Sequence, residues 1–192
     1  MPTEIIRNAS FLISAISFLG MAVLFGDSLL LRFDLKTFLK SLGFLLLTGA
    51  SIINLFNHQY TQISIWLFVA GFLLIFVGFI IDSHSILKLS FPIPLVLLFI
   101  LRDHLLLFFL GGFIAASVFQ LVYTTKHRDL IPLGVGFVLI AAGEYLYSLE
   151  SMSKLAPIAD AGSFLYLLSC SVLLLWLWAY LALRVVYLFK SG

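Results

Sequence analysis

The chain has 192 residues, of which 62% are hydrophobic and 10% are charged, whereas soluble domains carry about 25% charged residues. A water-soluble globular fold is therefore excluded. A formal net charge of +2, scattered along the chain, argues against a nucleic-acid partner. The single cysteine, Cys170, excludes an intrachain disulfide and a cysteine metal cluster.

The apolar residues come in long blocks separated by short charged clusters, as is typical of multi-pass helical membrane proteins. We therefore expect an all-α integral protein of the cell or cytoplasmic membrane, with the lipid bilayer as its first partner. About 20 helical residues cross a hydrocarbon layer of about 30 Å. Six blocks have roughly this length: residues 5–25, 35–56, 62–81, 104–124, 131–149 and 162–189. The first block lacks the leader charge and cleavage site of a secretory signal, so we expect a mature membrane helix.

The segment 87–103 is ambiguous because its uninterrupted apolar run, 91–101, is short. By length alone it suggests a re-entrant or interfacial segment beside six helices. The basic residues favour a crossing. With seven helices, one side carries Arg32, Lys36, Lys40, Lys88, Lys126, Arg128, Arg184 and Lys190, and the other only Arg7, Arg102 and Lys154. With six helices the two sides are nearly equal, so the positive-inside rule predicts seven, with the N-terminus outside and the C-terminus inside.

A weak internal repeat agrees with seven helices. "LGFLLL" (42–47) resembles "VGFVLI" (135–140), and "AGFLL" (70–74) resembles "AGSFL" (161–165) at a similar offset. The whole chain then reads as one transmembrane domain in a 3+1+3 plan of parallel halves. Residues 1–83 form the first half, 84–103 a linker helix and 104–192 the second half. Chance similarity between membrane helices is the alternative explanation.

Glu144 is the acid that we place clearly within the hydrocarbon. It lies about six residues from the outer end of its helix, roughly 9 Å deep at the α-helical rise. A buried carboxylate normally faces a cavity or the bundle interior, because exposing it to lipid costs several kcal/mol. Helical spacing places Ile140, Tyr147 and Ser148 on the same face as Glu144.

Other polar residues share this outer level under the seven-helix topology. They are Asn54, Asn57, His58, Gln62, Ser64, His104, Ser163 and Tyr166. We interpret them as an outward-facing polar vestibule with Glu144 at its floor. The alternative is that helix ends are polar in any membrane protein. The ligand contacts that we select are Glu144, Tyr147, Ser148, Tyr166, Asn54 and His104.

Catalytic, metal and cofactor sites are not indicated. The four histidines have no spacing typical of metal ligands, and neither a nucleophile elbow nor a zinc helix is recognisable. A serine hydrolase or an intramembrane metallohydrolase stays open only in principle. Retinal is disfavoured because every lysine is placed in a loop or at a helix end. We expect no cofactor and no metal.

Two resemblances bear on function. The stretch from "YTTKHRDLIPLGVGFVLIAAGEYLYSLE" into "AGSFLYLLSCSVLLLWLWAY" resembles the seven-helix sensor modules of bacterial and archaeal histidine kinases and related signalling proteins. This resemblance implies a last helix that leads to a cytoplasmic output domain; because the chain stops at "LFKSG", we expect an excised module or one that acts through partners. The 3+1+3 plan is similar to that of SWEET-type sugar transporters, but their proline–glutamine pair is absent here.

The sequence therefore predicts a membrane sensor or receptor-like module that binds a small or lipidic ligand from the outer side and signals to partners or to a second copy. The first alternative is a small-solute transporter in which Glu144 is a coupling or substrate site. The second is a structural subunit whose interface is the small-residue face of the helix 104–124. That face comprises Gly111, Gly112, Ala115 and Ala116.

Overall fold

The computed structural model describes the chain except for residues 1, 32, 58–60, 83–92, 94–95, 98–102, 154–155 and 191–192. Its elements are α1 (Pro2–Leu31), α2 (Leu35–Asn57), α3 (Gln62–Asp82), α5 (Asp103–Thr125), the 3-10 turn η2 (Arg128–Leu130), α6 (Ile131–Ser153) and α7 (Ala156–Lys190). No strand occurs in this described part. The all-helical class is therefore confirmed.

Within the described residues, six helices are long and apolar enough to cross a membrane, and they match the six full-length spans expected from the sequence. The protein is thus built as a multi-pass membrane protein. Two helices run further than expected. α1 continues past residue 25 to Leu31, and α7 begins at Ala156 rather than at residue 162. Most of the segment 87–103 lies outside the described residues, so the seventh span and the linker helix stay predictions.

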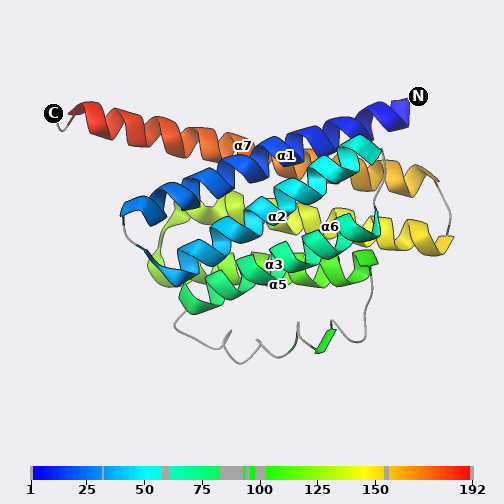
Figure 1. Ribbon diagram of the computed structural model, residues 1–192, viewed down its shortest axis with the longest axis horizontal. Helices are drawn as coiled ribbons and strands as arrows, with labels where there is room; N and C mark the ends of the chain where they lie inside the picture. Colours follow the sequence, from blue (N-terminus) through cyan, green and yellow to red (C-terminus); the bar gives the residue numbers. More distant parts are fainter. Residues whose placement is uncertain are drawn as a thin grey trace.

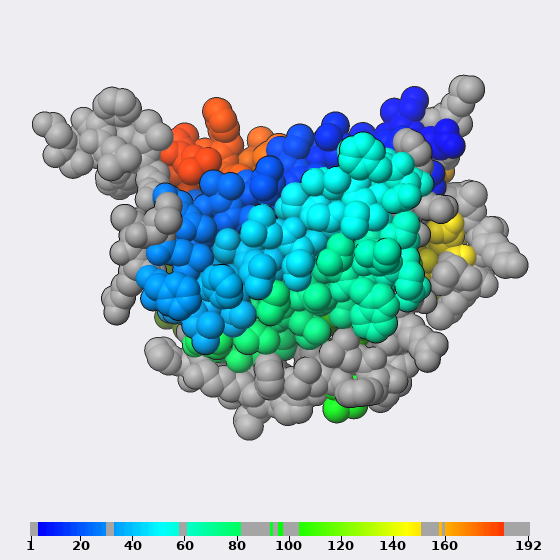
Figure 2. All heavy atoms as spheres, in the orientation of Figure 1, coloured from blue at the N-terminus to red at the C-terminus, as the bar shows by residue number. Residues whose placement is uncertain are grey.

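The six helices form a closed ring. Each helix packs on the next in the order α1, α2, α3, α5, α6 and α7, and α7 packs back on α1 (Figure 1). Exposed side chains such as Leu19, Ile52 and Trp66 point away from the ring, as expected of groups that face lipid. Figure 2 shows α1, α2 and α3 packed side by side into one continuous surface.

The contacts between α1 and α7 establish their relative direction. Ser17 bonds to Cys170, and Gly20, one turn further along α1, meets Leu177, two turns further along α7, so α1 and α7 run in the same direction. Successive helices within 2–82 and 103–190 are antiparallel (Figure 1). α3 and α5 consequently run in the same direction, and the end of α3 and the start of α5 lie at opposite ends of the bundle.

Aromatic side chains fill the middle of the ring. The ring of Phe137 on α6 lies 6.2 Å from that of Phe44 on α2 and 6.2 Å from that of Phe72 on α3, measured between centroids. All three side chains are fully buried. They separate the polar groups at one end of the bundle from those at the other.

Hydroxyl groups join neighbouring helices because a buried hydroxyl needs a partner in an apolar medium. Ser17 on α1 donates to the carbonyl oxygen of Cys170 on α7 at 2.8 Å. Ser41 on α2 donates to the carbonyl of Ala22 on α1 at 2.9 Å, and Ser169 on α7 to that of Gly136 on α6 at 2.6 Å. These bonds help to hold the framework on which the polar site is built.

Candidate functional site

The centre of the candidate site is a direct contact between His104 and Glu144. Nδ1 of His104, in the first turn of α5, lies 2.6 Å from Oε2 of Glu144 on α6. Glu144 has 0% side-chain exposure and His104 has 14%. A distance this short is typical of a hydrogen bond between charged or proton-sharing groups. The sequence placed both residues at the same level, and the structure brings them together.

The close approach of α5 and α6 explains how this pair forms. Gly111 lies two turns along α5 from His104, on the same face, and Ala141 lies one turn before Glu144. A Cβ atom at Gly111 would stand only 3.2 Å from the Cβ of Ala141. Small residues on both helices therefore bring the backbones together, and the longer side chains one or two turns away reach each other.

Tyr147, expected on the same helix face as Glu144, forms a hydrogen bond to α7. Its hydroxyl lies 2.7 Å from Oγ of Ser163 on α7, and its ring lies 5.3 Å from the His104 ring between centroids. Tyr147 thus braces the imidazole and joins α6 to α7. Ser148 is buried on the same side of α6.

Three buried groups at this end have polar atoms without a hydrogen-bond partner among the described residues. They are Oε1 of Glu144, the hydroxyl of Tyr166 on α7 and both amide atoms of Asn54 on α2. Each of these side chains has 0% exposure. An unpaired buried polar group costs about 1–3 kcal/mol, and such groups in native proteins usually contact a water molecule, an ion or a ligand.

The helix register places these groups in one layer near the end of the ring. Tyr166 packs edge-on against Phe68 of α3, with the ring centroids 6.3 Å apart, and lies within electrostatic range of Glu144. On α2, Leu47 lies beside Gly71 of α3, so the antiparallel register brings Asn54 to the level of the first turns of α3. We call Asn54, His104, Glu144 and Tyr166 the polar layer.

The expected open vestibule is wrong in one respect. Glu144, Asn54 and Tyr166 are completely enclosed by the helices, so Glu144 is not at the floor of an open cavity. The 14% exposure of His104 makes it the member of the polar layer nearest to the surface. His104 is therefore the side chain of this layer that solvent reaches.

Other residues expected in the vestibule stabilise helix ends instead. Asn57 donates to the carbonyl of Ile53 at the end of α2. Ser64 and Thr61 exchange hydrogen bonds at the start of α3, in the manner of a capping box. Gln62 is exposed. His58 lies outside the described residues.

Sequence reasoning missed one buried charge at the opposite end of the bundle. Lys40, assigned to a helix end, is 5% exposed, and its Nζ lies 4.3 Å from the ring centroid of Phe79 and 5.8 Å from that of Phe25. Gly78 lies against the Lys40 side chain and so leaves room for it. Contact between an ammonium group and aromatic faces lowers the cost of this burial.

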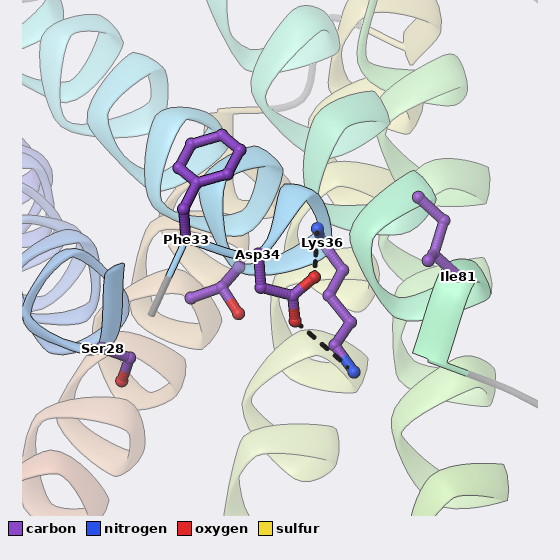
Figure 3. A pocket seen from close by; sticks show the side chains of 6 residues that line it. Ser28, Phe33, Asp34, Lys36 and Ile81 are labelled. Atoms are coloured by element: carbon purple, nitrogen blue, oxygen red, sulfur yellow. Dashed lines mark hydrogen bonds and ion pairs between the residues drawn. The ribbon is translucent and has the colours of Figure 1, made fainter. Parts of the chain in front are cut away.

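A cleft of about 570 Å³ opens near Lys40, between the ends of α1 and α3 and the start of α2. Figure 3 shows Asp34 and Lys36 in this cleft with Ser28, Phe33 and Ile81 around them. Oδ2 of Asp34 lies 3.6 Å from Nζ of Lys36, and Oδ1 accepts from the Lys36 backbone N–H at 3.4 Å. Asp34 thus acts as the cap of α2.

The described ranges contain no group of three or more His, Cys, Asp or Glu side chains that could together bind a metal ion such as zinc. The oxygen atoms of the polar layer belong to amide, phenol and carboxyl groups. Such donors suit hard monovalent ions and hydrogen-bonding ligands better than they suit zinc.

Comparisons with family models, with curated proteins and with solved structures found no match. The expected resemblance to sensor modules therefore stays a prediction. The chemistry of the polar layer follows from its own side chains.

Proposed function

We propose that this protein is a membrane-embedded sensor that binds a small or lipidic ligand in the polar layer from the outer side and passes the event to partner proteins. The observation that carries the proposal is the state of Glu144. One carboxyl oxygen is held by His104, and the other is buried without a protein partner among the described residues.

The remaining members of the polar layer support a ligand rather than a packing role. Asn54 offers an amide donor and acceptor from α2, across the ring from α6, and Tyr166 offers a hydroxyl from the neighbouring helix α7. Convergent polar groups in an otherwise apolar interior are the usual design of a small-molecule site. A ligand that engages groups on α2, α5, α6 and α7 would change how these helices pack, which is what a sensor needs.

We also propose the full seven-helix topology, N-terminus outside, with residues 84–103 as the crossing fourth segment of a 3+1+3 plan. The shared direction of α3 and α5 supports it, because the chain between them has to join opposite ends of the bundle. The test is labelling of Lys88→Cys and Arg102→Cys, in a Cys170→Ser background, with a membrane-impermeant maleimide on intact cells. We expect Arg102→Cys, on the outer side, to be labelled and Lys88→Cys, on the inner side, to be protected. Equal labelling of the two variants would place both positions on one side and reject the crossing.

The ligand-binding test uses purified protein and a panel of small polar compounds and phospholipids. We expect at least one compound to raise the unfolding temperature of the wild type and of Glu150→Gln, but not that of Glu144→Gln. Glu150 is the matched control because it lies on the same helix in a partly exposed position. A compound that stabilises all three proteins equally would place its site elsewhere.

The alternative function is a small-solute transporter. The helices α1, α2 and α3 run in the same directions as α5, α6 and α7, respectively (Figure 1). This arrangement favours a transporter, because transporters built from parallel repeats have it. Flux of a candidate solute into proteoliposomes, abolished in Glu144→Gln, would select this alternative. The layer of Phe44, Phe72 and Phe137 would then have to open during transport.

The structural-subunit alternative uses the small-residue face of α5. Gly111 and Ala115 are buried within the chain, whereas nothing lies within 4 Å of a Cβ built on Gly112, and Ala116 is exposed. Gly112→Leu would disrupt an assembly through this face. A change in oligomer size on gel filtration would support the structural role.

A further inference from the structure

Three of the four unpaired atoms of the polar layer are oxygen atoms with lone pairs. They are Oε1 of Glu144, the amide oxygen of Asn54 and the hydroxyl oxygen of Tyr166, all enclosed and without a partner in the described chain, and the fourth is the amide nitrogen of Asn54. A cation, inorganic or ammonium, is the species that oxygen lone pairs hold. The carboxyl group supplies the negative charge that such an ion requires.

The charge of the His104–Glu144 pair limits what else can bind. An ionised Glu144 beside a neutral imidazole carries one negative charge, which is unfavourable inside a membrane protein. One added proton makes the pair neutral, and so does one added monovalent cation at Oε1. Adding both would leave a net positive charge in an enclosed apolar site, which is again unfavourable.

We propose that the polar layer is a binding site for one small monovalent cation, held by Glu144, Tyr166 and Asn54, that exchanges with one proton on the His104–Glu144 pair. This inference rests on the proposed function in that it names the ligand class of the same site. Binding of one cation releases one proton to the outer solution, so charge and atoms balance. His104, the partly exposed member, is the group through which the proton leaves.

Other titratable groups near the His104–Glu144 pair lie on the helices α7, α6 and α1. α5 presents His104 to Glu144, and α7 presents Tyr166. Cys170, one turn further along α7, is a neighbour of Tyr166. Glu150 on α6 and Asp160 on α7 lie nearer the helix ends and are partly exposed. α1 packs on α2 and α7 and carries Arg7 near the same end, also partly exposed.

The test is a thermal titration of detergent-purified protein, read by tryptophan fluorescence, in which NaCl or methylammonium chloride replaces choline chloride at constant ionic strength. We expect a saturable rise in unfolding temperature for wild type and Glu150→Gln and no rise for Glu144→Gln. Tyr166→Phe and Asn54→Leu should weaken the apparent affinity, whereas Tyr145→Phe, on an exposed position of α6, should not. A response to Na⁺ alone identifies a metal ion, and a response to methylammonium identifies an ammonium group.

The pH dependence has a definite sign. The cation binds the form that lacks the exchangeable proton, so its apparent affinity should rise as the pH rises. In the range where the pair is protonated, each unit by which the pH is lowered should weaken the affinity by about tenfold. A titration that is flat in the wild type, or saturable but independent of pH, would overturn the exchange.

A second measurement needs no variant. Addition of the effective salt to weakly buffered wild-type protein should acidify the solution by about one proton per site, read with a pH indicator, whereas choline chloride should not. No acidification would reject the exchange even if the variants fail to fold. If the cation titration is flat but a compound from the panel still stabilises wild type and not Glu144→Gln, the cation is wrong and the sensor function stands.

Discussion

Gly43 of α2 and Gly71 of α3 face each other so closely that a Cβ atom on either would stand within 2.8 Å of the other's carbonyl oxygen. No side chain fits at that distance without moving a backbone. The contact anchors the register of α2 against α3, and this register places Asn54 in the polar layer.

Gly43→Ala should therefore destabilise the protein, by about 1–3 kcal/mol as for an overpacked core. The matched control is Gly49→Ala in the same helix, where no atom lies within 4 Å of the added Cβ. That control should be neutral or stabilising by about 0.5–1 kcal/mol, because alanine favours helix more than glycine does. Unfolding in detergent measures both, and equal effects would contradict the proposed close contact.

The His104–Glu144 pair should show strong coupling in a double-mutant cycle with His104→Ala and Glu144→Ala. We expect about 1–3 kcal/mol of coupling, because the pair is enclosed and in direct contact. Asp34 and Lys36 form the comparison pair, since both are more than a third exposed at 3.6 Å. Their coupling should be near zero. Similar values for the two cycles would show that burial adds nothing to the His104–Glu144 contact.

Ser17→Ala should lower stability by about 0.6 kcal/mol, the average for hydrogen bonds between membrane helices. Ser17 donates to a carbonyl on α7, whereas Ser28 donates to Leu24 within its own helix and is exposed. Ser28→Ala should change the unfolding free energy less. The opposite order would indicate that the α1–α7 bond is not formed in the folded protein.

Cys170 should resist alkylation in the native protein. Its side chain is 0% exposed and contacts Ser14 across the α1–α7 interface, with Oγ and Sγ 3.1 Å apart. N-ethylmaleimide should label it only after denaturation in SDS. A His127→Cys, Cys170→Ser variant, with the thiol in an exposed turn, is the positive control. Rapid native labelling of Cys170 would show that α1 and α7 separate.

Hydrophobic blocks were sufficient to predict the six spans, because a helix that crosses lipid needs length and apolar composition above all. The pairing of His104 with Glu144 was only partly accessible. Their common depth could be inferred from topology, but their contact depends on Gly111 packing against Ala141, two residues that look ordinary in the sequence.

Two features escaped sequence reasoning for physical reasons. The partner of Tyr147 is Ser163 on another helix, which helical spacing on α6 alone cannot reveal. Lys40 was assigned to a polar helix end because charge normally indicates solvent, yet Phe25 and Phe79 come from distant segments to cover it. Both outcomes depend on tertiary neighbours rather than on local pattern.

The length of α7 has a mechanical consequence. Its 35 residues extend about 52 Å at the α-helical rise, well beyond a hydrocarbon layer of about 30 Å. From Leu177, which packs on Gly20, the helix continues for about 20 Å to Lys190, away from the rest of the bundle (Figure 1). A tilt of about 10° at that contact would displace the far end by about 3 Å over this length. Because Tyr166 of the polar layer lies on this same continuous helix, a small rearrangement there would be carried along α7 to its far end, at the opposite end of the bundle.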